Sequence, residues 1–79
     1  MTAKIYVTLK RGVLDPQGQA VAHALGRLGF DEVKGARIGT YIELQLDGDP
    51  AVSGARVEAM CRDLLANLVI EEYRFELVD

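Results

Sequence analysis

The 79-residue sequence has one cysteine, one histidine, two prolines and no tryptophan. A single cysteine excludes an internal disulfide and a thiolate cage for a metal ion, so no staple strengthens the fold. No apolar run approaches the roughly 20 residues that cross a bilayer, and residues 1–5 lack the apolar stretch of a secretory signal. We therefore expect a cytoplasmic protein without membrane contact.

Positive charge is also scarce. Nine Lys and Arg residues face twelve Asp and Glu residues, which gives a formal net charge of -3 at pH 7. The basic residues are scattered singly and no aromatic run offers a stacking platform, so nucleic acid is not an expected partner.

The length allows one domain, residues 1–79, because domains typically need about 100 to 150 residues. Apolar residues make up 49% of the chain and charged residues 27%, the balance of a folded globular protein. A core this small predicts that close packing or self-association supplies the stability that no disulfide or metal provides.

Three segments alternate between apolar and polar residues and are predicted to be strands. Residues 4–10 come first, and residues 72–77 come last. The middle segment, residues 33–47, is too long for so small a domain and must bend at Gly39, form a hairpin or project beyond its own domain. The predicted inward residues are Ile5, Val7, Leu9, Ile42, Leu44, Leu46, Tyr73, Phe75 and Leu77.

Two helices are predicted between these strands, each beginning at an Asp-Pro pair that supplies a cap and a preset φ. The first starts at Asp15 and ends at Gly29, with an apolar stripe of Val21, Ala24, Leu25 and Leu28. The second starts at Asp49, and its stripe comprises Val57, Met60, Cys61, Leu64, Leu65 and Leu68.

This order of elements predicts an α+β fold in which two helices pack on one face of a small, mainly antiparallel sheet with a long bent middle strand. The arrangement is of the ferredoxin-like kind. The opposite sheet face is more aromatic than solvation requires, and it is either a subunit interface or an ordinary solvated surface. The candidate interface residues are Tyr6, Arg37, Gly39, Thr40, Tyr41 and Glu43.

No catalytic constellation can be assembled from this sequence. Cys61 falls in the apolar stripe of the second helix, and His23 points away from the stripe of the first. Neither has a partner for nucleophilic or metal chemistry, and both common nucleotide-binding glycine motifs are missing. We expect no catalytic, cofactor-binding or metal site in this chain.

The chain resembles the PurS family, and the resemblance rests on motifs in the right order and spacing. They are Leu14-Asp15-Pro16-Gln17-Gly18 at the first helix start, Arg37-Ile38-Gly39 at the bend, and Leu64-Leu65-Ala66-Asn67 at the second helix end. Matching residues cover nearly the whole chain. Thr40 stands where family members often have lysine, so an anion contact of that lysine is not implied here.

The resemblance implies a non-catalytic subunit of phosphoribosylformylglycinamidine synthase, a ligase of purine biosynthesis. Its expected partners are a glutaminase subunit, a large synthetase subunit, and further copies of itself as a dimer or a dimer of dimers. The complex would use ATP with Mg and glutamine, none of them bound by this chain alone. The alternative is an ACT-like module that senses a small molecule, and an independent small enzyme is disfavoured by the lack of a catalytic set.

Overall fold

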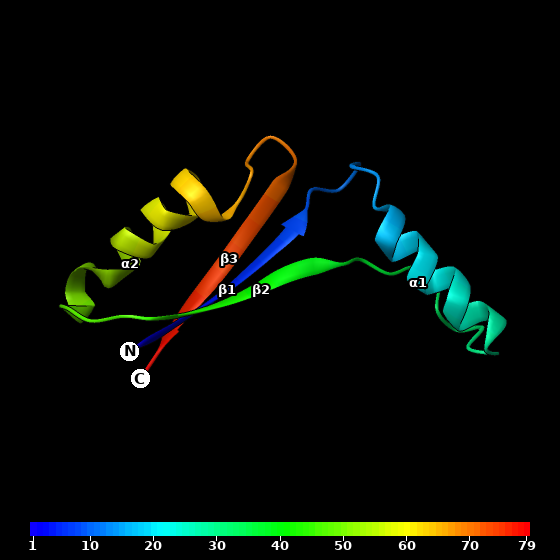
Figure 1. Cartoon of the computed structure of the whole chain (residues 1–79), viewed down its shortest axis with the longest axis horizontal. Coiled ribbons are helices and arrows are strands. Elements are labelled where there is room, and N and C mark those ends of the chain that lie inside the picture. Colours follow the sequence, from blue (N-terminus) through cyan, green and yellow to red (C-terminus); the bar gives the residue numbers. More distant parts are fainter.

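The computed structural model describes residues 1–79 and contains one three-stranded antiparallel sheet with the strand order β2-β1-β3 (Figure 1). The strands are β1 (Thr2–Leu9), β2 (Gly39–Gln45) and β3 (Glu71–Val78). Ile5 on the central strand lies opposite Ile42 on β2 and Phe75 on β3. This register gathers the predicted inward residues on one face, which confirms the three alternating patterns.

Both helices begin where the sequence predicts. They are α1 (Pro16–Arg27) and α2 (Pro50–Met60), each with proline in its first turn. Asp15 accepts a hydrogen bond from the Gly18 N–H at 2.9 Å, and Asp49 accepts one from the Ala51 N–H at 2.9 Å. The caps satisfy amides that have no partner inside the helix. Gly29 has a φ of 97° just after the end of α1, as its predicted role there requires.

The core is small and lies between α2 and one face of the sheet. Only 8 of the 79 residues are buried, so each of them contributes a large share of the packing. The buried apolar residues are Ala3, Ile5, Val7, Val57, Cys61 and Ala66, and the half-buried side chains of β2 and β3 pack around them. The prediction that Cys61 is a core residue is confirmed.

The end of α2 differs from the prediction. Residues Cys61–Leu65 form a π turn, in which the Ala66 N–H donates to the Cys61 carbonyl at 3.0 Å. The extra residue in this turn rotates Leu64 away from the sheet, leaving it 83% exposed. Leu68 lies beyond the helix and is also exposed. The assignment of Leu64 and Leu68 to the core stripe was therefore wrong.

The middle strand is shorter than the predicted segment 33–47, because ladder pairing begins only at Gly39. A Cβ atom on Gly39 would lie 2.5 Å from the carbonyl oxygen of Val7, so only glycine allows this close approach to β1. Residues 31–38 lead from α1 to this point without joining the sheet. The predicted bend at Gly39 is where the strand starts.

The α+β class and the element order are confirmed, but α1 is placed differently from the expected two-helix cover. Only α2 lies over the sheet, whereas α1 projects beyond the end of the strands (Figure 1). The molecule measures 49 × 27 × 14 Å, and Gly18 is the one buried residue of α1. We call residues 10–38 the α1 arm. Most of its apolar stripe is exposed, since Val21, Ala24 and Leu28 are exposed and only Leu25 is half-buried.

Candidate subunit interface

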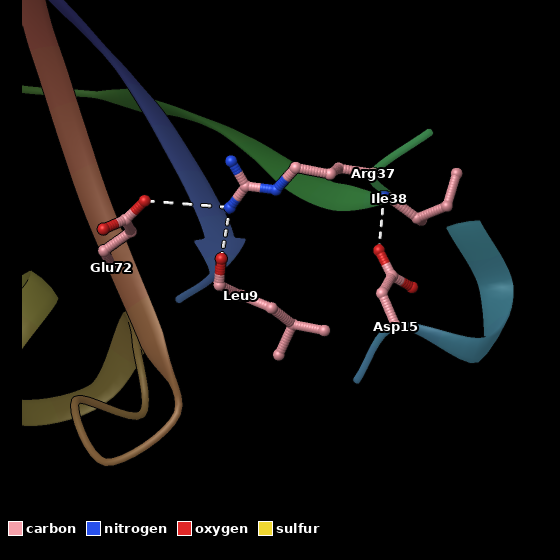
Figure 2. A network of polar contacts seen from close by, with 5 residues as sticks. All are labelled: Leu9, Asp15, Arg37, Ile38 and Glu72. Carbon is pink, nitrogen blue, oxygen red and sulfur yellow. Dashed lines mark hydrogen bonds and ion pairs between the residues drawn. The ribbon is translucent and has the colours of Figure 1, made fainter. Parts of the chain in front are cut away.

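The base of the α1 arm is held by a polar junction, drawn in Figure 2. The two carboxylate oxygens of Asp15 accept hydrogen bonds from the Gly18 N–H and the Ile38 N–H, each at 2.9 Å. One side chain thus joins the start of α1 to the residue before β2. The bond from Ile38, then that from Gly18, holds the pKa of Asp15 below its ordinary value.

Arg37 completes this arm junction from the returning side. Its guanidinium donates a hydrogen bond to the Leu9 carbonyl at the end of β1 and lies 3.7 Å from a carboxylate oxygen of Glu72 on β3 (Figure 2). Both charged side chains are about half exposed, so we expect the ion pair to contribute little stability. The ion pair connects the arm to the edge strand β3.

The first turn of α1 also fits closely against the returning chain. A Cβ atom on Gly18 would lie 2.2 Å from the Ala36 carbonyl oxygen, so a larger residue would push the two segments apart. The polar bonds and this tight fit fix the base of α1 at the end of the sheet. They give a physical reason why α1 does not lie over the sheet beside α2.

The sheet face opposite α2, which we call the outer face, carries an ordered aromatic cluster. The Tyr6 and Tyr41 ring centroids are 5.2 Å apart, and the Arg74 guanidinium carbon lies 3.9 Å from the Tyr6 ring centroid. The Tyr6 hydroxyl donates to Glu76 at 3.2 Å. A shallow hollow of about 420 Å³ adjoins the cluster, lined by Tyr6, Thr8, Arg37, Glu72, Tyr73 and Arg74.

The structure brings most of the predicted interface residues together. Tyr6, Gly39, Tyr41 and Glu43 share the outer face, because Tyr41 pairs with Tyr6 and Gly39 with Thr8. Arg37 precedes β2 and reaches the hollow from the arm junction.

Thr40 is the exception among these residues. It pairs with the buried Val7 and so belongs to the α2 side of the sheet. The sequence analysis also missed Arg74. The alternation of residues 72–77 already places its side chain on the other sheet face from the inward Phe75.

Two apolar surfaces remain without a partner. On α1 the exposed stripe includes Val21 and Leu28, the latter 73% exposed. On α2, Met60 and Leu64 line a hollow of about 320 Å³. Met60 lies roughly 160° around the helix from Glu58. Glu58 accepts a hydrogen bond from Tyr73 on β3, so the side of α2 that carries Met60 faces towards β2. We call this side, with Met60 and Leu64, the α2 flank.

The remaining candidate reactive residues lie apart from each other. Cys61 is buried, and burial, aided by the nearby Glu58 charge, raises the pKa of its thiol. His23 is exposed on α1, as predicted. No group of three or more His, Cys, Asp or Glu side chains is arranged to hold a metal ion. Neither α1 nor α2 has the length and apolar character that spanning a bilayer requires.

Replacing Cys61 tests whether its role is structural. Cys61→Ser should lower the free energy of unfolding by about 1 to 3 kcal/mol, because a hydroxyl enters an apolar site that offers it no hydrogen-bond partner. Cys61→Ala removes the sulfur without adding a polar group and serves as the control. Urea unfolding measures both. Unchanged stability of Cys61→Ser would contradict the core assignment.

The family model of PurS, described as phosphoribosylformylglycinamidine (FGAM) synthase, matches residues 2–79. The phosphoribosylformylglycinamidine synthase subunit PurS of Bacillus subtilis is 50% identical over 74 residues, which cover 94% of this chain and 88% of the relative. The same subunit of Synechocystis sp. is 52% identical over 75 residues, covering 94% and 75%.

Solved structures show the same similarity. The Bacillus subtilis PurS structure superposes with a TM-score of 0.88 at 47% identity, covering 99% of this chain and 98% of that one. A chain in the structure of PurLQS from Thermotoga maritima superposes with a TM-score of 0.82 at 27% identity, covering 99% of each. The arm and the sheet therefore occur together in experimentally determined relatives.

Proposed function

Because the chain belongs to the PurS family of phosphoribosylformylglycinamidine synthase subunits, we propose that it is the non-catalytic subunit that joins the other components of that enzyme. The observation that carries this proposal is the α1 arm, an amphipathic helix held away from its own sheet with most of its apolar stripe exposed. A helix in that position is suited to contact another chain.

The proposed division of labour follows the chemistry of the reaction. A glutaminase subunit releases ammonia from glutamine, and a large synthetase subunit uses ATP with Mg to activate the amide oxygen of formylglycinamide ribonucleotide. Ammonia then replaces that oxygen to give the amidine. In this scheme the present chain binds neither ATP nor glutamine. Its side chains hold the two enzymes in a fixed relation, so that ammonia formed by one is used by the other.

We further propose that the single domain, residues 1–79, self-associates as a dimer or a dimer of dimers. In our proposal the stripe of α1 packs beside the α2 flank of a second copy, around Met60 and Leu64, and β2 offers its unpaired edge. Each sheet would then have two helices on one face, one from each chain. The thin core supports this arrangement, because intermolecular burial supplies what one chain lacks.

The outer face would serve as a second contact surface, directed at an enzyme subunit. Tyr6, Tyr41 and Arg74 support this assignment, because tyrosine and arginine are enriched at the energetic centres of interfaces. Their mutual stacking holds the side chains in place before binding. Less conformational entropy is then lost on association.

Reconstitution tests the proposed function. Purified glutaminase and synthetase without this chain should form the amidine from free ammonia but not from glutamine, and adding the chain should restore the glutamine-dependent reaction. The three proteins should co-elute in size-exclusion chromatography. Full glutamine-dependent activity without the chain would contradict the proposal. Binding of a free amino acid by the isolated chain, with no co-elution, would favour the ACT-like alternative.

A further inference from the structure

We propose that Asp15 is a positioning residue that fixes the direction of the α1 arm, so that the arm is presented to a second copy and does not fold onto its own sheet. This inference rests on the self-association proposed above. It concerns the cause of the arm's direction, which neither the helix pattern nor family membership explains.

The arm leaves and re-enters the sheet at adjacent points. Its outgoing side follows Leu9 at the end of β1, and its returning side enters β2 at Gly39, which pairs with Thr8. Two hydrogen bonds cross between these sides, and in both of them the donor lies on the returning side (Figure 2). Asp15 on the outgoing side accepts from the Ile38 N–H, and Arg37 on the returning side donates to the Leu9 carbonyl. Together they hold the two sides of the arm against each other at its base.

Asp15 differs from Asp49, the other capping aspartate, because it also makes a bond to a distant segment. Asp49 accepts a bond from the Ala51 N–H at 2.9 Å and so caps α2 within its own segment. Asp15 also caps its helix, but its second oxygen binds a backbone amide 23 residues away. Bonds from amides to a carboxylate are stronger than those between neutral groups. This long-range bond within the chain therefore links the start of α1 to the start of β2.

The fit at Gly18 acts in the same direction. Its α-carbon sits so near the Ala36 carbonyl that a Cβ atom would lie 2.2 Å from that oxygen. The helix start thus has a seat on the returning segment as well as a bond to it. A fixed arm loses less conformational freedom when its stripe docks, which favours association between chains.

Distance measurements between two spin labels test this proposal directly. Cysteines at Arg27 on the arm and Gln45 on β2 would be labelled in a Cys61→Ala background, with the labelled chains diluted in unlabelled protein. We expect a narrow distance distribution. Asp15→Asn should broaden it, because the amide nitrogen cannot accept the second N–H, and should weaken self-association about tenfold.

The matched control is Asp49→Asn. This substitution alters a helix cap that makes no long-range bond, so it should leave the distance distribution narrow. Gly18→Ala should also broaden it, whereas Gly26→Ala, with nothing within 4 Å of the added Cβ, should not. A narrow distribution for Asp15→Asn, or equal broadening for Asp49→Asn, overturns the positioning role. Broadening in Asp15→Asn together with a monomeric wild type overturns the self-association and leaves the positioning of the arm standing.

Discussion

Leu28→Glu is expected to convert the protein from an oligomer to a monomer. Leu28 ends the apolar stripe of α1 and is 73% exposed in the single chain, so its replacement removes little packing inside the fold. In the proposed dimer, however, the new carboxylate would be buried against the second copy without a partner. Light scattering at tens of micromolar protein should report one chain for the variant and at least two for the wild type.

Two further measurements separate this effect from unfolding. The far-ultraviolet circular dichroism of Leu28→Glu should match that of the wild type, and its melting temperature should no longer depend on protein concentration. The control is Leu14→Glu, because Leu14 is also exposed but lies before α1 and outside the stripe. An oligomeric Leu28→Glu variant, or a monomeric wild type, would show that the arm does not carry the contact.

Ile5→Ala should have the largest effect on stability. Ile5 is 0% exposed on the central strand and lies between residues of both neighbouring strands. Truncating such a residue costs about 2 to 5 kcal/mol, whereas a chain of this length has roughly 4 to 12 kcal/mol of total stability. We therefore expect the midpoint of urea unfolding to fall steeply, with part of the population unfolded in buffer.

Val69→Ala is the control for this substitution, because Val69 is exposed in the connection before β3 and its truncation should change stability by less than about 0.5 kcal/mol. A loss below about 1 kcal/mol for Ile5→Ala would mean that the site collapses around the missing atoms or that the core lies elsewhere.

The local features of the fold could be predicted because short-range patterns determine them. Alternation in the three strands follows from the two-residue period of a pleated chain, which a half-buried sheet makes visible in the sequence. The two Asp-Pro pairs mark the helix starts because a cap and a fixed φ act within four residues. Long-range information is not needed for either inference.

The placement of α1 could not be predicted in this way. An amphipathic stripe such as Val21 and Leu28 indicates that a helix covers something, but not whether the covered surface belongs to the same chain. The rotation of Leu64 also escaped, because a π turn does not alter the spacing of apolar residues in the sequence.

Two features of the candidate interface differ in how much signal the sequence held. The bond between Asp15 and Ile38 joins segments far apart in the chain, and a capping aspartate gives no sign of a second partner. The side of Thr40 could have been found, because a residue next to the outward Tyr41 must face the other way in a strand.

The strand order also constrains how the protein can form. The central strand β1 begins at residue 2, and one of its two neighbours, β3, ends at residue 78, so the sheet brings together the two ends of the chain (Figure 1). Contacts between such distant residues are slow to form, because nearly the whole chain must be closed into a loop first. Before β3 has been made, Ile5 and Val7 lack their pairing partners Phe75 and Tyr73 along one edge of β1. That edge of β1 thus stays unpaired until residues 71–78 have been made, and an open strand edge is a site at which another chain can pair and start aggregation.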